Sequence, residues 1–201
     1  MTVNRKAILR MRNMNKLRSL NDGAMWPLFR VGLYVDMPNL YAIMRNKGSI
    51  PNLGELIVVS HSLGDLIFAK CYTTIHTDYH NHSIIGLERM GYTVIPRFVP
   101  NTDYGIKKDI DTFLAVDAVR DLLINKLDIL IIASNDSDFL PVMKLTREVG
   151  KVSIAMVSSH DEAKLLSEFA TVYLEGIWCK SKDDTIENNN AEIEVVEEAV
   201  S

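Results

Sequence analysis

The stretch from Asp128 to Val142, which reads DILIIASNDSDFLPV, constrains the fold more than any other part of the chain. Ile129 to Ala133 is apolar throughout and rich in Ile, which is typical of a strand buried on both faces of a parallel sheet. Polar residues follow at once, and apolar residues then recur at helical spacing from Phe139 to Leu145. This order predicts a strand, a turn with Ser134 or Asp136 as the N-cap, and a helix.

The rest of the chain repeats this order of strand and helix. We expect strands at 30–35, 65–74, 92–98, 152–157 and 171–174, and helices at 53–63, 79–90, 109–123 and 161–169. In the helix that opens at Asp109, the stripe expected to be buried includes Ile110, Phe113, Leu114, Ala118, Leu122 and Leu123. Such alternation is typical of parallel βαβ units. We therefore predict a three-layer α/β/α sandwich with a mostly parallel central sheet of about five or six strands, Rossmann-like in class.

Carboxylates stand where predicted strands end. Asp36 closes the first strand just before Pro38, which cannot continue a strand, and Asp136 and Asp138 follow the apolar run. Asp111 lies in the first turn of its helix and is the residue there best placed to project toward the same edge. In open α/β sheets ligands bind at the carboxyl edge of the strands. Clustered carboxylates repel one another unless cations are bound, and hard oxygen ligands select Mg²⁺ or Mn²⁺.

A carboxylate group of this kind predicts phosphoryl transfer, and a nuclease is the natural inference. We expect Asp36 and Asp136 to hold the principal metal ion, and Asp111 and Asp138 to complete the site or to position a metal ion through water. Besides a role in the turn alone, three readings of Asn39 stay open: it orients Asp36, it caps a helix, or it contacts water or phosphate. The candidate substrate-binding residues are Asn39, Ser134, Asn135, Lys107 and Lys108.

Charge divides the 201-residue chain into three parts, although its net charge is only -4. Residues 1–29 are basic, residues 30–176 form the predicted domain, and residues 177–201 form an acidic tail that we expect to be disordered. The basic extension is either an amphipathic helix or an arm without fixed structure. Its positive charge either attracts nucleic acid or is simply solvated by water.

Composition argues against several classes of protein. Cys71 and Cys179 have no CxxC spacing, so neither a zinc site nor a disulfide framework is predicted, and a reducing cytoplasm suits them. No segment approaches the roughly 18 to 20 apolar residues of a membrane span. We therefore expect a cytoplasmic protein with no membrane partner.

Three segments resemble the motifs of a known family. YVDMPNLY at 34–41, KDIDTFLAVDA at 108–118 and ILIIASNDSDFLPVMKLTREVGKVSI at 129–154 are similar to the three motifs of the NYN domain, in its LabA/DUF88 branch, which belongs to the PIN-like nuclease group. The resemblance spans about residues 30–174. It implies a PIN-like fold and metal-dependent cleavage of RNA.

The resemblance also implies a set of site residues. The matching positions are Asp36, Asp111, Asp136, Asp138 and Asn39. Met37, Asp109 and Asn135 stand where glycine is common in the family. These departures remove no carboxylate, but they bear on loop geometry, because glycine adopts a positive φ that other residues adopt only at a cost.

We therefore predict a Mg²⁺- or Mn²⁺-dependent ribonuclease that acts on single-stranded RNA. One alternative is an RNA-binding or regulatory module with little or no turnover, and another is a phosphatase that acts on small substrates. Binding to RNA should weaken steeply with salt, whereas a small-molecule phosphatase should show little salt dependence. A homodimer is left open.

Overall fold

The computed structural model of the protein describes residues 29–46, 49–75, 81–98, 107–158, 166, 169–174 and 179–181. The strands are β1 (Arg30–Asp36), β2 (Ser49–Pro51), β3 (Asp65–Ile75), β4 (Tyr92–Phe98), β5 (Ile129–Ala133), β6 (Val152–Val157), β7 (Ala170–Tyr173) and β8 (Cys179–Ser181). The helices are α2 (Met37–Asn46), α3 (Leu53–His61), α4 (Asn81–Arg89), α5 (Lys107–Ile124), the 3₁₀ helix η2 (Ser137–Phe139) and α6 (Leu140–Glu148).

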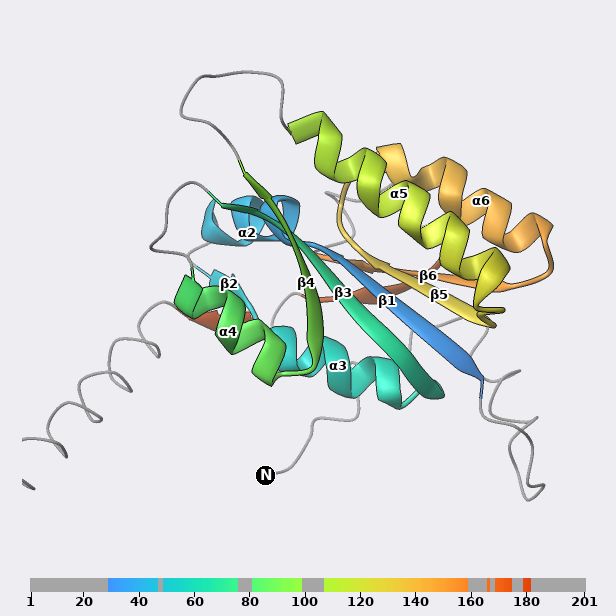
Figure 1. Ribbon diagram of the computed structural model, residues 1–201, viewed down its shortest axis with the longest axis horizontal. Helices are drawn as coiled ribbons and strands as arrows, with labels where there is room; N and C mark the ends of the chain where they lie inside the picture. Colours follow the sequence, from blue (N-terminus) through green and yellow to red (C-terminus); the bar gives the residue numbers. More distant parts are fainter. Residues whose placement is uncertain are drawn as a thin grey trace, which may run out of the picture.

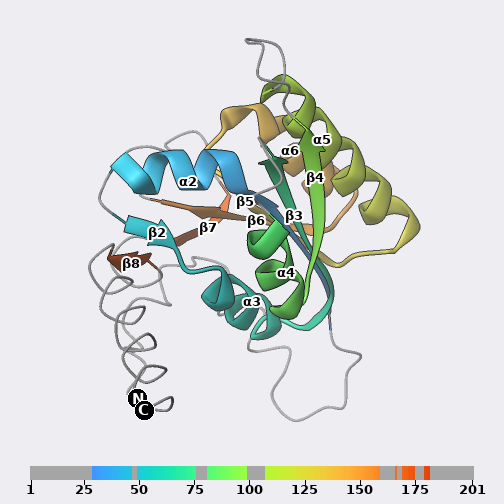
Figure 2. The same ribbon diagram turned by 60° about the vertical axis from the view of Figure 1, so that its left-hand side comes forward.

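The described strands form one large sheet and one small one. The large sheet has six strands in the order β4-β3-β1-β5-β6-β7, and every neighbouring pair is parallel. Helices α5 and α6 cover one face, and α3 and α4 cover the other (Figures 1 and 2). The predicted three-layer α/β/α sandwich is therefore confirmed. Strands β2 and β8 pair separately and antiparallel.

The central strands supply side chains to both layers. Ile129, Ile131 and Ala133 of β5 lie in one core with residues of α2, α3 and α4, whereas Leu130 and Ile132 lie in the other core with residues of α5 and α6. All five are buried. Because successive side chains of a strand point to opposite faces, an unbroken apolar run is what a strand between two helical layers requires.

Glycines end two of the predicted helices. Gly91 follows α4 with φ 97°, and Gly150 follows α6 with φ 75°. A positive φ is unfavourable for residues with a Cβ atom, so both glycines allow the chain to leave the helix and enter the next strand.

The structure corrects two expectations about α5 and the tail. Phe113 and Leu123 were expected in the buried stripe of α5, but they are 43% and 58% exposed. At 100° per residue they fall outside the arc that faces the sheet. The expected tail began at 177, but β8 pairs with β2, so three of its residues form a strand.

Several expected segments lie outside the described residues. These are the basic extension at 1–28, most of the helix expected at 161–169, and the acidic tail after 181. Within the described part of the chain, no helix is both long and apolar enough to cross a bilayer.

A buried polar cluster joins α5 to the sheet. The Asp121 carboxylate accepts hydrogen bonds from the hydroxyl of Tyr34, at 3.0 Å, and from Nζ of Lys70. One turn earlier, Asp117 accepts a hydrogen bond from the hydroxyl of Tyr72 at 2.8 Å. Burial, reinforced by these carboxylates, raises the pKa of both tyrosines, so they remain hydrogen-bond donors. The cluster therefore fixes the position of α5 on β1 and β3.

We predict that Asp121→Ala lowers the free energy of unfolding by about 3 to 5 kcal/mol, because it leaves a buried lysine without its main partner. The Lys70 and Asp121 side chains are only 13% and 5% exposed. Tyr34→Phe removes one hydrogen bond and should cost about 1 kcal/mol. Urea denaturation of both variants measures the difference. Equal losses would contradict a structural role for the buried ion pair.

A second polar group stabilises the sheet at the end where its strands begin. Asp128 accepts hydrogen bonds from the backbone N–H of Arg30 at 3.0 Å and from Nζ of Lys151 at 2.9 Å. Burial raises the pKa of Asp128, but these two donors lower it more, so the pKa lies below its ordinary value. The ionised form therefore stabilises the fold.

We predict a pH-dependent effect of Asp128→Asn. Because the pKa of Asp128 is lower in the folded state, its contribution is complete above its ordinary pKa and is lost as the pH falls through the folded value. At pH 7 the variant should be less stable by about 1 kcal/mol, since the ion pair is partly exposed to solvent. Chemical denaturation from pH 7 down to about pH 2, below the ordinary pKa of an aspartate, should show this difference shrinking at the acidic end. A difference that stays constant would argue against the ionised interaction.

Candidate functional site

The register of β1 against β5 places Asp36 beside Ser134. Val35 pairs with Ala133, so the next residue of each strand stands at the same level of the carboxyl edge. Asp36 is 2% exposed and Ser134 is fully buried. The hydroxyl of Ser134 donates a hydrogen bond to Oδ2 of Asp36 at 2.9 Å, and the backbone N–H of Asn39 donates to Oδ1 at 3.3 Å.

The loop after β5 continues this network. The hydroxyl of Ser134 also accepts a hydrogen bond from the backbone N–H of Asp136 at 3.0 Å. The Asp136 carboxylate accepts from the backbone N–H of Asp138 at 2.9 Å and caps η2. Of the two N-caps predicted here, Asp136 is therefore confirmed, although it caps η2 rather than α6 itself.

Two asparagines link three strand ends. Oδ1 of Asn39, at the start of α2, accepts a hydrogen bond from the backbone N–H of Asn135 at 3.0 Å. The Asn135 side chain in turn accepts from the backbone N–H of Ser158 at 2.8 Å and donates to the Ser158 hydroxyl. The ends of β1, β5 and β6 are thus held together by side chains.

The residues that stand where glycine is common in the family need no unusual backbone conformation. Lys126 alone, among the described residues other than glycine, has a positive φ. Met37 begins α2, Asn135 lies in the loop after β5, and Asp109 lies in the first turn of α5. These residues therefore introduce no left-handed backbone strain, and Asn135 adds an amide that glycine would lack.

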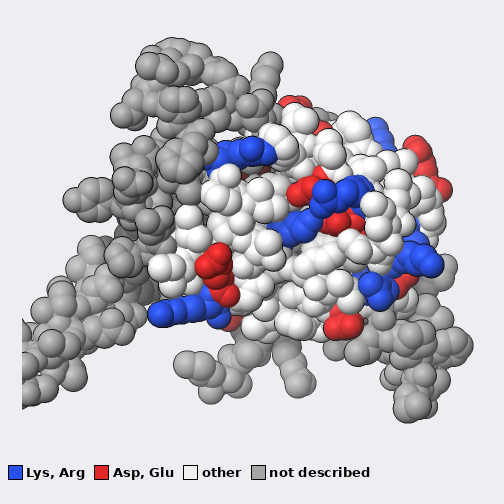
Figure 3. Space-filling view, in the orientation of Figure 1, with Lys and Arg blue, Asp and Glu red and all other residues white. Residues whose placement is uncertain are grey.

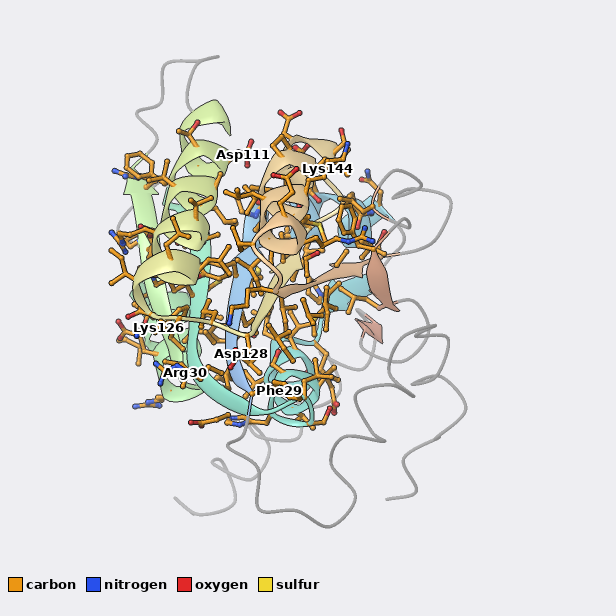
Figure 4. The ribbon with its side chains drawn as sticks, turned by 90° about the vertical axis from the view of Figure 1, so that its right-hand side faces the viewer. Phe29, Arg30, Asp111, Lys126, Asp128 and Lys144 are labelled. Carbon is orange, nitrogen blue, oxygen red and sulfur yellow. The ribbon has the colours of Figure 1, made fainter. Side chains whose placement is uncertain are left out.

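Asp111 brings a third carboxylate to Asp36. Burial raises the pKa of Asp36 to about 6, the hydrogen bonds from Ser134 and Asn39 oppose that rise, and the charges of Asp111 and Asp136 add to it. Figure 4 shows Asp111 at the end of the sheet opposite to Asp128. Carboxylates from β1, α5 and the loop after β5 therefore interact at the carboxyl edge.

The structure gives the other predicted residues different places. Asp138 contributes its backbone N–H, but its side chain is exposed. Ser134, Asn39 and Asn135, expected to bind substrate, all make hydrogen bonds that hold the strand ends together. The side chains of Lys107 and Lys108 lie outside the described part of the structure.

The oxygen ligands fit a small divalent cation in type. Among the described residues, no three His, Cys, Asp or Glu side chains are placed to hold one metal ion together. However, Asp36, Asp111 and Asp136 interact electrostatically. Mg²⁺ keeps several waters and is commonly bound by one or two carboxylates together with substrate phosphate. The group fits an ion held in that way.

Sequence reasoning named Asn135 as a substrate-binding candidate but missed the contact by which it supports the site. Its partner Ser158 is 23 positions away, and hydrophobic periodicity carries no signal for such a contact. A signal did exist for Asp121. It lies on the arc of α5 that also carries Ala118 and Leu122, so a carboxylate on the buried face of the helix predicted a partner in the sheet.

Comparison with known proteins identifies the domain. The model of the NYN domain family matches residues 30–175, which include all three interacting carboxylates. No curated protein matches the chain significantly. A crystal structure of a protein of unknown function from Vibrio parahaemolyticus is 18% identical and has a TM-score of 0.64, over 76% of this chain and 97% of the other, which shows a similar fold. The match to the family model spans most of the chain, which therefore belongs to the NYN domain family of PIN-like nuclease domains.

Proposed function

We propose that this NYN domain is a divalent-metal-dependent ribonuclease. The observation that carries the proposal is the buried carboxylate of Asp36, which interacts with the charges of Asp111 and Asp136 at the carboxyl edge of a parallel sheet. An ionised carboxylate that is buried beside two others is costly unless a cation compensates it. This edge is also where open α/β sheets bind their ligands.

Asp36 and Asp136 would hold the cation, and Asp111 and Asp138 would hold its waters. When bound, Mg²⁺ or Mn²⁺ lowers the pKa of a water molecule and neutralises phosphate charge. Ser134 donates a hydrogen bond to Asp36 and accepts one from the backbone of Asp136, so it sets the spacing of these two carboxylates. Asp111, which is partly exposed, would accept a proton from the attacking water.

Asn39 would contact the substrate through its amide nitrogen. Its Oδ1 accepts the backbone N–H of Asn135, and its Nδ2 donates to none of the described residues. As hydrogen-bond donors, the two amide N–H groups would suit a phosphate oxygen. This proposal combines two of the three readings of Asn39 that the sequence left open. The backbone N–H of Asn39 orients Asp36, and its side chain would contact phosphate.

A second function is favoured by one observation. The carboxylates are not gathered around a common point in the described structure. A module that binds RNA with little or no turnover would have this arrangement.

Our proposal further assigns the domain to the LabA/DUF88 branch and takes single-stranded RNA as its substrate. It also places the protein in a reducing cytoplasm, which suits the buried free thiol of Cys71.

We predict that the protein cleaves mixed-sequence single-stranded RNA with Mg²⁺ or Mn²⁺ and not with chelator. Asp36→Asn and Asp136→Asn should each lower the cleavage rate at least about 100-fold, because each removes a ligand to the cation. Ser134→Ala should lower it about 10- to 100-fold, because it releases the carboxylate of Asp36 and the backbone N–H of Asp136 from their shared hydrogen-bond partner. Rates are measured on end-labelled RNA.

The matched control is Asp65→Asn. Asp65 begins β3 at the opposite edge and is exposed, so this variant should cleave at the parent rate. Cleavage that survives in both site variants would mean that the site is misplaced or that the activity is a contaminant. A parent protein that binds RNA with a steep salt dependence but never cleaves it would establish the binding module instead.

We also predict that Mn²⁺ stabilises the protein through Asp36. At a concentration about 100 times its dissociation constant, an ion that binds only the folded state adds about 2.7 kcal/mol, or roughly 5 to 11 °C in the melting temperature of a domain of this size. Asp36→Asn should show no such shift, whereas Asp65→Asn should keep it. The same shift in Asp36→Asn as in the parent would exclude Asp36 as a ligand.

A further inference from the structure

Arg97 and Phe113 form a stacked pair beside the carboxylate group. Arg97 lies near the carboxyl end of β4, and its Cζ atom is 3.3 Å from the centroid of the Phe113 ring in α5. Phe113 is 43% exposed, which is unusual for a large aromatic residue in a helix that packs on a sheet. The pair therefore presents both a cation and an aromatic surface toward solvent.

The charge of Arg97 is not balanced within the described structure. None of the described carboxylates forms an ion pair with it, and its Nε atom is covered without a hydrogen-bond partner there. An aromatic ring holds a guanidinium group in place through cation–π attraction but leaves its full positive charge. Arg97 is thus oriented and remains able to bind an anion.

Strand register places this pair next to the proposed cleavage site. Tyr72 pairs with both Asp36 and Ile95, and Arg97 is two residues further along β4. Since β4 is two strands from β1, the lateral separation is about 10 Å. Asp111 and Phe113 lie about 200° apart around α5, so one approaches Asp36 and the other approaches β4.

Figure 3 separates two places where basic side chains reach this face. One blue patch lies between the end of β4 and the first turns of α5, bordered by uncharged atoms. A second group beside the middle of α5 contains both signs of charge, and Arg120 of α5 is ion-paired with Asp117 at 3.0 Å. Among the described residues, Arg97 therefore differs from Arg120 in keeping its charge for a ligand.

We propose that Arg97 and Phe113 form a subsite that holds one nucleotide of a single-stranded RNA next to the carboxylate group, an inference that rests on the proposed function. The guanidinium of Arg97 donates hydrogen bonds to a backbone phosphate, and the exposed part of the Phe113 ring contacts a base. Single strands are commonly bound by such combinations of arginine and aromatic side chains, because every base has an aromatic face.

The test measures binding of labelled single-stranded RNA to the full chain by fluorescence polarisation, in the non-cleaving Asp136→Asn background. Arg97→Gln should weaken binding about 5- to 10-fold at 0.1 M salt. It should also reduce the slope of log affinity against log salt by about 0.7, because one phosphate contact is lost. Phe113→Leu should weaken binding at least about 5-fold without changing the slope.

Arg147→Gln is the matched control. Arg147 also lies over an aromatic ring, with its Cζ atom 5.0 Å from the Phe169 centroid, but it is in the last turn of α6 at the opposite edge. This variant should bind RNA as the background protein does. If Arg97→Gln fails to fold, Arg97→Lys serves instead, and it should keep the salt slope while binding less tightly because it cannot stack or form two parallel hydrogen bonds.

The outcomes separate this inference from the proposed function. If Arg97→Gln keeps the background affinity and slope, or if Arg147→Gln loses as much, the subsite is wrong whether or not the protein cleaves RNA. If Arg97→Lys is the variant measured, an affinity equal to that of the background protein overturns the subsite. If the parent protein neither binds nor cleaves RNA, the proposed function fails and the subsite fails with it.

Discussion

The parallel pairing of β1 with β5 is the interaction on which the carboxylate group depends. It brings together two segments 98 residues apart and sets their register, so that the hydroxyl of Ser134 meets the carboxylate of Asp36 as both strands end. A shift of one residue would turn every side chain of a strand to the other face. The apolar residues of β5 that face two different cores forbid such a shift. Core packing thereby determines the position of a polar group.

Helix α5 places the carboxylate of Asp111 near that of Asp36, although the two charges repel each other. Asp111 raises the pKa of Asp36 through its charge, so electrostatics alone would separate them. Two turns or more along the same helix, Tyr34 and Lys70 hold Asp121 against the sheet. Attraction in the middle of α5 therefore outweighs repulsion at its start. Sites that bind cations commonly retain unfavourable charge in this way, and the rest of the fold compensates for it.

The strands and the residues at their carboxyl ends could be predicted from sequence, because apolar runs and the residues that end them are local signals. The exposure of Phe113 could not. Helical periodicity defines which residues share an arc, but the width of the buried arc depends on where the helix lies across the sheet, and that is a tertiary property. Strand β8 was missed for a related reason. It is three residues long and pairs with β2, which is equally short, so neither has a pattern of its own.

The two cations on the α5 side of β3 and β4 show how charge separates a structural group from a binding group. Lys70 lies within reach of Asp117 and Asp121, and its side chain is nearly buried, so its charge is neutralised inside the protein. Arg97 is held by an aromatic ring instead, which fixes its orientation and leaves its charge. A lysine in that position would lack the planar surface that stacks on the ring. Within the described residues, the protein therefore has an oriented cation without an ion-pair partner beside a group of carboxylates. In our proposal, a phosphate strand with its own cations would supply the missing charges on both sides.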